Sequence, residues 1–262
     1  MLNIRGNLAA SVYVFYPRNH TDEACRPVAS SAWDIVSSGL GVEVFLSEYN
    51  FVPYAQEEIG RLREIGRVAK LLTCHTNQFG WDRDKLEAEI PFVAGLGGSI
   101  LVVHPATFGF ERCDNPPPPS VLRDICKSAA DSGVRIAFEN SGRTGIEMMR
   151  RAVDTVGADL ESIGMGICID TGHANRSVRL DGFRAQDYLR EFRDLIVEVH
   201  INDNFGEEDL HLAPGQGDIE WDAVLPELGA LREPTVLCIE LARPDIDPME
   251  ALRQSCEFLC GP

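Results

Sequence analysis

The sequence predicts an α/β fold, a single (β/α)8 TIM barrel that spans residues 1–262 as one domain. Short runs of β-branched and other apolar residues recur along the chain, and the last residues of successive runs are 29 to 40 positions apart. Segments with the apolar spacing of a helix lie between these runs. Eight strand-then-helix units without an interrupting linker are typical of a closed parallel barrel.

The individual elements are expected where these patterns lie. The apolar runs predict strands over 11–15, 42–46, 70–75, 100–104, 135–139, 166–170, 196–200 and 235–240. Helical spacing covers residues 55–65, 82–94, 121–130, 146–156, 186–192, 221–231 and 249–259. Two irregular tracts, 108–119 and 201–218, are long for connections, so we expect them to be functional loops.

An open, doubly wound sheet is the alternative to a barrel, because it also alternates strands and helices. A dinucleotide-binding protein of that fold carries a glycine-rich fingerprint directly after its first strand. The nearest candidate here, GLGGS at 95–99, precedes a strand instead. The count of eight units also favours the closed barrel.

The charge balance argues against a polyanionic partner. The chain has 24 basic and 41 acidic side chains, a formal net charge of −17. Nucleic acid is therefore not the expected partner, since its binding normally requires a basic surface. No segment has the length and apolarity of a membrane span or a secretory signal, so we expect a cytoplasmic protein. The eight cysteines are scattered and are expected to be reduced thiols.

Six of the predicted strands end in a side chain that can bind a metal or move a proton. These are His75, His104, Glu139, Asp170, His200 and Glu240, and His173, Asp209 and His211 follow in the loops. In a barrel the carboxyl ends of the strands converge on one mouth, where active sites of this fold lie. A single histidine at a strand end is commonly a hydrogen-bonded core residue. Several buried carboxylates at one mouth, however, require a cation or another partner.

We therefore predict a metal site made by Glu139, Asp170, His200 and Glu240. Three carboxylates and one imidazole suit Mn²⁺, Mg²⁺, Co²⁺ or Zn²⁺ rather than a softer metal. The adjoining residues Asn140, Asn202 and Asp203 are expected either to orient these ligands or to serve as capping and turn residues.

Several motifs resemble one family in their order and spacing. FEN at 138–140, DTGHAN at 170–175, VHINDN at 199–204, DLHLAPGQGDIEW at 209–221 and IEL at 239–241 resemble the xylose-isomerase-like TIM-barrel superfamily. This group contains sugar and sugar-phosphate isomerases and epimerases, inosose-type dehydratases and the endonuclease IV apurinic-site nucleases. The resemblance to the epimerases implies one divalent metal on Glu139, Asp170, His200 and Glu240. It also implies that the two glutamates exchange a proton of the substrate carbon while His173 steadies a substrate oxygen.

The resemblance to endonuclease IV implies a different use of the same cavity. In that enzyme the cavity holds three zinc ions, whose additional ligands match His75, His104, His173, Asp209 and His211. The chain departs from that pattern with DTGH at 170–173 in place of DTCH and with ENSGRTG at 139–145. It departs from the ketohexose 3-epimerases with Gly206, where they carry an arginine. The loops offer arginines for phosphate contacts at Arg112, Arg143, Arg176, Arg179 and Arg243.

The predicted function is that of a divalent-metal-dependent isomerase or epimerase, which acts on a small sugar, sugar phosphate or keto-polyol through an enediolate intermediate. The alternatives are an endonuclease IV-like multinuclear zinc phosphodiesterase, a metal-dependent dehydratase of a keto-polyol, and a non-catalytic sugar-binding barrel. The sequence has no GxSxG elbow, no Walker loop and no cysteine with an evident base. Nucleophilic and nucleotide-dependent mechanisms are therefore not favoured.

Overall fold

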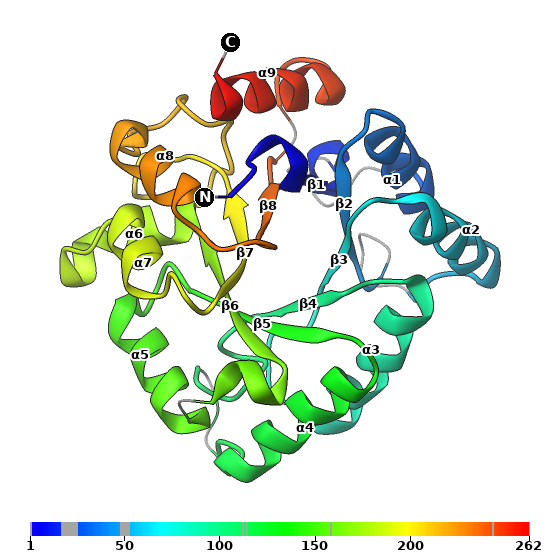
Figure 1. Cartoon of the computed structure of the whole chain (residues 1–262), viewed down its shortest axis with the longest axis vertical. Helices are drawn as coiled ribbons and strands as arrows, with labels where there is room; N and C mark the ends of the chain where they lie inside the picture. Colours follow the sequence, from blue (N-terminus) through cyan, green and yellow to red (C-terminus); the bar gives the residue numbers. More distant parts are fainter. Residues whose placement is uncertain are drawn as a thin grey trace.

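Within the residues that the structure describes, eight parallel strands pair in sequence order and close into a barrel with helices outside it (Figure 1). This computed structural model describes residues 2–16, 26–47, 53–111, 113, 115–157, 159–242 and 244–261. Every neighbouring pair of strands is parallel, including the closing pair β1 and β8. The predicted (β/α)8 TIM barrel is confirmed.

The strands are short, with four to six residues each. They are β1 (Leu8–Ser11), β2 (Gly41–Phe45), β3 (Leu72–His75), β4 (Ile100–Val103), β5 (Arg135–Glu139), β6 (Met165–Asp170), β7 (Ile196–Ile201) and β8 (Val236–Ile239). Strands β3, β5 and β6 end at the predicted residues His75, Glu139 and Asp170. The predicted ends of β2, β4, β7 and β8 are each within one residue of the observed ends.

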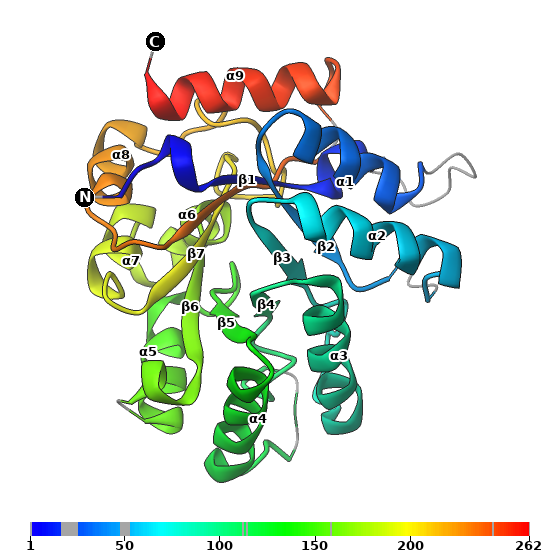
Figure 2. The same cartoon turned by 45° about the vertical axis from the view of Figure 1, so that its right-hand side comes forward.

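The helices follow the strands and form an outer ring. They are α1 (Val28–Ser37), α2 (Gln56–Val68), α3 (Arg83–Leu96), α4 (Pro119–Asp131), α5 (Gly145–Val156), α6 (Thr171–Asp181), α7 (Ala185–Glu191), α8 (Trp221–Gly229) and α9 (Pro248–Cys260), with short 3₁₀ helices η1 (Arg5–Asn7), η2 (Val12–Phe15) and η3 (Leu160–Ile163). Figures 1 and 2 show α9 between α8 and α1, so the ring follows chain order. None of the helices in the described parts of the chain is long and apolar enough to cross a bilayer.

The prediction of the first strand is wrong. The alternating pattern predicts it over 11–15, but β1 ends at Ser11 and the following residues form η2. The Ser11 hydroxyl accepts a hydrogen bond from the main-chain N of Tyr13, which caps this turn. The last three residues of this strand are small, and Ala9 faces the crowded barrel interior and pairs with Gly41.

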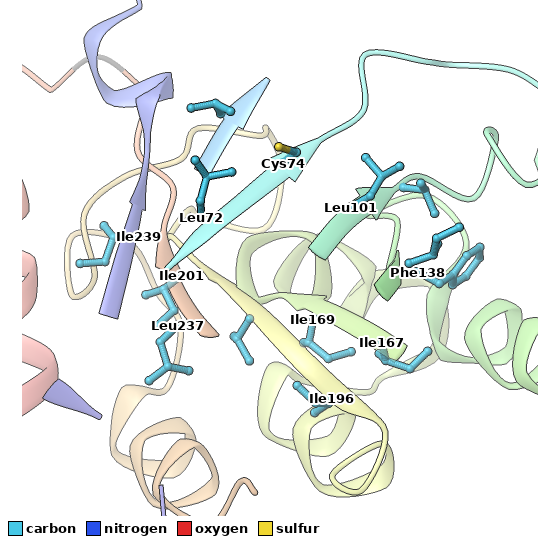
Figure 3. Packing of buried hydrophobic residues seen from close by; sticks show 14 of the residues in the cluster. Leu72, Cys74, Leu101, Phe138, Ile167, Ile169, Ile196, Ile201, Leu237 and Ile239 are labelled. Atoms are coloured by element: carbon cyan, nitrogen blue, oxygen red, sulfur yellow. The ribbon is translucent and has the colours of Figure 1, made fainter. Parts of the chain in front are cut away.

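The two faces of each strand belong to different cores. Outward residues such as Leu101 of β4, Phe138 of β5 and Leu237 of β8 pack in the main core between the barrel and the helices (Figure 3). Alternate residues such as Ala137 and Cys168 face the barrel interior and form a second, smaller core. Side chains alternate along a strand, so the next inward positions after these two are Glu139 and Asp170. The same alternation that builds the interior thus directs polar side chains into the mouth.

The cysteines are placed as reduced thiols. The seven that the structure describes are free, and Cys74, Cys126, Cys168 and Cys238 are buried. Cys25 lies outside the described residues.

Candidate active site at the barrel mouth

The ends of four consecutive strands bring the four predicted metal ligands together. Glu139 ends β5 and Asp170 ends β6, whereas His200 is the penultimate residue of β7 and Glu240 directly follows β8. Their ligand atoms all lie within 4.8 Å of one another. His200 Nδ1 is 3.0 Å from Glu139 Oε1 and 3.4 Å from Glu240 Oε2. All four side chains are buried, and together they are called the lower cluster.

Asp170 is held by hydrogen bonds on both carboxylate oxygens. Its Oδ1 accepts from the main-chain N of His173 at 2.5 Å, which makes Asp170 the N-cap of α6. Its Oδ2 accepts from Asn202 Nδ2 at 2.7 Å. The Asn140 side chain bonds the main-chain N and O of Asp170 at 2.6 and 3.0 Å. Asn140 and Asn202 therefore both contact a predicted metal ligand, as a role in orienting that ligand requires.

His173, Asp209 and His211 form a second group above the first, here called the upper cluster. Their ligand atoms also lie within 4.8 Å of one another. Asp209 Oδ2 is 3.2 Å from His173 Nε2 and 3.1 Å from Arg176 Nη1, and Asp209 Oδ1 is 3.7 Å from His211 Nε2. Burial raises the pKa of Asp209, but His173 and His211 outweigh burial and hold that pKa well below its usual range. One carboxylate thus has three basic neighbours.

Asp203 has a different role from its two neighbours, because it organises the loop that carries Asp209 and His211. Its buried carboxylate accepts hydrogen bonds from Trp221 Nε1 at 2.8 Å and from the main-chain N of Gly215 at 2.9 Å. The structure therefore favours the turn-residue role that the sequence left open for Asp203.

His211 has a backbone conformation that is unusual for a residue other than glycine. Its φ is 46°, and it is the one non-glycine residue of the described chain with a positive φ. The main-chain N of Ala242 donates to the His211 carbonyl at 3.0 Å. Backbone strain of this kind is held in place by surrounding contacts and occurs often at functional sites.

Three histidines at the mouth use Nδ1 in the same way. Each has Nδ1 at hydrogen-bond distance from a main-chain oxygen, 2.9 Å for His75 and Thr76, 3.0 Å for His173 and Asn140, and 3.1 Å for His211 and Glu240. Donation from Nδ1–H turns Nε2 towards the cavity. His75 Nε2 and His104 Nε2 are each 3.5 Å from Glu139 Oε2. The upper part of the cavity is therefore lined by imidazoles.

The lower cluster contains more carboxylates than imidazoles. Burial raises the pKa of Glu139, but its basic partners His200 and His75 outweigh burial and hold that pKa well below its usual range. Burial also raises the pKa of Glu240, and His200 and His211 outweigh it and lower the pKa to about 2. Glu139 Oε2 is buried and accepts no hydrogen bond from the residues that the structure describes. Three carboxylates thus share one imidazole within the cluster.

Both clusters open into one cavity of about 270 Å³. Its wall consists of Tyr13, Phe45, Ser47, His75, Thr76, Asn77, Phe79, His104, Glu139, His173, Asp209, His211 and Glu240. Phe79 stacks on His104 with their ring centroids 5.1 Å apart. Burial, and then the neighbouring His75, lower the pKa of His104 to about 4, so its ring is neutral near neutral pH. Cavities for drug-sized ligands measure roughly 300–1000 Å³, so this one suits a small polar molecule.

Two buried glutamates beneath the lower cluster were not predicted from the sequence. Glu43 of β2 and Glu198 of β7 are fully buried and face the barrel interior beside His200. Glu198 Oε1 accepts a hydrogen bond from the Thr73 hydroxyl at 2.9 Å. Burial, and then the charge of Glu43, raise the pKa of Glu198 to about 8. A glutamate in the middle of an apolar barrel strand has no route to solvent. Its position within such a run is the sequence signal that could have found both residues.

The loop arginines are distributed among different partners. Arg176 contacts Asp209, and Arg179 lies 3.9 Å from a carboxylate oxygen in the loop after β7. Arg143 is exposed, and Arg112 and Arg243 lie outside the described residues. Arg176 and Arg179 are thus already paired with carboxylates, which does not favour phosphate binding by these two side chains.

Comparison with known sequences finds a family and uncharacterized relatives. A family model described as xylose isomerase-like TIM barrel matches residues 47–261. MJ1311, an uncharacterized protein of Methanocaldococcus jannaschii, is 30% identical over 154 residues, which are 55% of this chain and 51% of that protein. The chain spans between 51% and 64% of the length of the curated relatives that it matches.

Comparison with solved structures finds the same fold. A D-tagatose 3-epimerase-like protein superposes with a TM-score of 0.70 at 22% identity, over 97% of this chain and 98% of that chain. The TTHB071 protein of Thermus thermophilus, studied by soaking with ZnCl2, superposes with a TM-score of 0.65 at 20% identity, again over 97% and 98%. At these identities the likeness shows a shared fold.

Proposed function

The chain belongs to the xylose isomerase-like TIM barrel family, and we propose that it is a divalent-metal-dependent isomerase or epimerase of a small sugar, sugar phosphate or keto-polyol. One observation carries the proposal: Glu139 and Glu240, two carboxylates able to take up and return a proton, line the same small cavity. The similarity in fold to a D-tagatose 3-epimerase-like protein supports this class of substrate. We further propose that the barrel is the single domain of this chain.

The lower cluster fits a divalent cation. Its members supply three carboxylates and one imidazole within 4.8 Å, and the buried Glu139 Oε2 lacks a hydrogen-bond donor among the described residues. Buried carboxylates in this number are costly unless a cation compensates them. Mn²⁺, Mg²⁺, Co²⁺ or Zn²⁺ would be held by Glu139, Asp170, His200 and Glu240. When bound, the cation supplies positive charge that stabilises negative charge on the substrate oxygens.

The two glutamates supply the proton transfer. Their lowered pKa values keep both ionised near neutral pH, so either carboxylate can act as a base. One carboxylate takes a proton from the carbon next to the substrate carbonyl, and the electron pair of that C–H bond forms the C=C bond of an enediolate. The other glutamate takes up a proton from a substrate hydroxyl or from solvent, and its delivery to the opposite face of the carbon completes an epimerisation. Return of the first proton to the neighbouring carbon, with transfer of the hydroxyl proton between the two substrate oxygens, completes an isomerisation. The neutral His104 is placed to hydrogen-bond a substrate hydroxyl.

Solvent deuterium exchange tests this mechanism. The protein is incubated with Mn²⁺ and ketohexoses or ketohexose phosphates in D2O, and deuterium in the recovered sugar is measured by mass spectrometry. We expect Glu139→Gln and Glu240→Gln each to lower the exchange rate by at least about 100-fold, because glutamine keeps the shape but is not a base. Glu207→Gln, which changes an exposed glutamate of the loop after β7, is the matched control and should exchange normally. Exchange that survives in both site variants would rule out the mechanism. A dehydrated product would instead identify a lyase.

A multinuclear zinc phosphodiesterase is the second candidate, because the upper cluster groups three further metal-binding side chains. Arg176, 3.1 Å from Asp209, already neutralises the carboxylate of that cluster. We therefore expect elemental analysis to find about one tightly bound divalent metal per chain. We also expect no incision of DNA with abasic sites at ~0.15 M salt, where a surface this acidic has no long-range attraction for the duplex. Two or three zinc ions, with incision that His75→Ala or His104→Ala abolishes, would establish the phosphodiesterase instead.

A further inference from the structure

His200 is oriented in the opposite way to the other histidines that anchor a ring nitrogen at the mouth. His75, His173 and His211 place Nδ1 against main-chain oxygens. His200 instead turns Nδ1 towards Glu139 and Glu240 and places Nε2 3.1 Å from Glu43 Oε2. Its Nε2 therefore faces a side-chain carboxylate, whereas its Nδ1 is the ring nitrogen within hydrogen-bond distance of Glu139.

The barrel explains why Nε2 of His200 faces a side chain. His200 lies within β7 and pairs with Asp170 on one side and Cys238 on the other. The main-chain oxygens of paired strands point along the sheet towards the neighbouring strand, whereas an inward side chain such as His200 faces other side chains in the barrel interior. Glu43 comes from β2, which does not neighbour β7, and it reaches His200 across the barrel interior.

His200 Nε2 and Glu43 Oε2 face each other at 3.1 Å, and both atoms are buried. In the described chain neither atom makes a hydrogen bond, so both are available to each other. The other Glu43 oxygen, Oε1, lies 3.8 Å from the Cys238 thiol, which can donate a weak hydrogen bond to it. A fully buried carboxylate is costly without a basic or hydrogen-bonding partner. The imidazole of His200 is the basic group that Glu43 contacts.

We propose that Glu43 is a positioning residue that accepts the Nε2–H of His200 and so directs the Nδ1 lone pair into the lower cluster. The assignment rests on the proposed function, because it gives Glu43 a role at the proposed cation site. A carboxylate that accepts the distal N–H of a ligating histidine fixes its tautomer and raises its basicity. Glu43 thus acts on the cation through His200 and does not contact the substrate.

Glu198 provides a matched control. It is as deeply buried as Glu43, faces the same interior, and lies two residues before His200 on the same strand. Its Oε1, however, is held by the Thr73 hydroxyl. Glu198→Gln therefore changes a buried carboxylate in the same layer of the barrel and leaves the Glu43 carboxylate in place.

Cation affinity tests the proposal on the full chain. Mn²⁺ binding is measured by calorimetry, and circular dichroism confirms that each variant folds. We expect Glu43→Gln to raise the Kd for Mn²⁺ about 10- to 100-fold and Glu198→Gln to change it less than about 3-fold. If Glu43→Gln does not fold, Glu43→Asp takes its place, because it keeps the acceptor but withdraws it by one methylene. We expect its Kd to rise by a smaller factor.

Histidine NMR adds a readout that a purely structural role would not change. In the Zn²⁺-loaded, ¹⁵N-histidine-labelled protein we expect a slowly exchanging Nε2 proton on His200, and we expect it to shift upfield in Glu43→Gln but not in Glu198→Gln. Unchanged Mn²⁺ affinity in Glu43→Gln, or equal losses in both variants, would refute the role of Glu43 while the cation site stands. If the wild type binds neither Mn²⁺ nor Zn²⁺, the proposed function itself fails, and the role of Glu43 fails with it.

Discussion

The lower and upper clusters contain the same kinds of side chain but balance their charges differently. The lower cluster has three buried carboxylates and one imidazole. The upper cluster has one carboxylate, that of Asp209, with two imidazoles and the Arg176 guanidinium around it. Proximity of metal-binding side chains alone would rank the two clusters equally. The number of buried carboxylates distinguishes them, and it supports the proposal that a cation binds at the lower cluster rather than at the upper cluster.

The two clusters also differ in what supports them. The lower cluster projects from the ends of β5 to β8, which the barrel ladder holds in register. Two of the three upper residues lie in the loop after β7, and the buried carboxylate of Asp203 holds that loop. The proposed cation site therefore belongs to the barrel ladder, whereas Asp209 and His211 of the upper cluster depend on one hydrogen-bonded loop.

The largest expected effect is a loss of Mn²⁺ affinity, and one aspartate from each cluster is compared. Asp170→Asn should weaken Mn²⁺ binding by at least about 100-fold, because it removes a charged ligand from the lower cluster. Asp209→Asn should weaken it by less than about 10-fold, since Asp209 is already neutralised by Arg176. Calorimetric titration of both variants measures the difference. Equal losses would show that the upper cluster also holds the cation and would remove the distinction.

The next effect concerns the loop support. Asp203→Asn should lower the free energy of unfolding by about 2–4 kcal/mol, because its amide group presents donors to the Trp221 and Gly215 N–H groups. Urea denaturation measures this change, with the exposed Asp218→Asn in the same loop as control. Mn²⁺ affinity should remain within about 3-fold of the wild type. A large loss of affinity would show that the barrel does not support the lower cluster independently of the loop.

The smallest expected effect is a pH dependence of the free energy of unfolding, caused by Glu89, a buried carboxylate outside both clusters. Burial, partly offset by the hydrogen bond from Thr76, raises the pKa of Glu89 to about 6. The folded state therefore favours the protonated acid. The stabilising contribution of protonated Glu89 is complete below the unfolded pKa near 4.5, and it is lost as pH rises through the folded pKa of about 6.

Replacing this carboxylate isolates the effect. The free energy of unfolding of Glu89→Gln, relative to that of the wild type, should rise by about 1–2 kcal/mol as the pH increases from 4 to 7.5. Urea unfolding of both proteins across this range measures it, with Glu87→Gln, on the exposed face of α3, as control. A difference that does not vary with pH would mean that burial without a cation does not penalise a carboxylate in this protein.

The sequence alone predicts the barrel and the strand ends at the mouth, because both follow from local apolar patterns. His75, Glu139 and Asp170 are the last residues of their strands, as their apolar runs indicate. Glu43 and Glu198 escape that reasoning, since attention to strand ends overlooks polar residues within a run. Their position within an apolar run signals burial, but their contacts with each other and with His200 across the barrel are contained in no local pattern.

Other features depend on tertiary structure as well. The alternation over 11–15 is typical of a strand, but the close packing of the barrel interior selects the small residues just before it. The positive φ of His211 follows from how its loop closes onto β8. Helix α6 begins directly at the end of β6, so the sequence offers no turn residues to mark its start.

Asp170 serves the fold as well as the site, because its Oδ1 caps α6. Loss of an N-cap typically costs about 0.5–2 kcal/mol, whatever reaction the protein catalyses. A descendant of this chain that abandoned its chemistry would therefore still be under selection to retain an aspartate, asparagine, serine or threonine here. Glu139 and Glu240 cap no helix and would be free to drift. Among related barrels, the joint presence of those two glutamates is thus expected to be a better marker of the proposed catalysis than the aspartate between them.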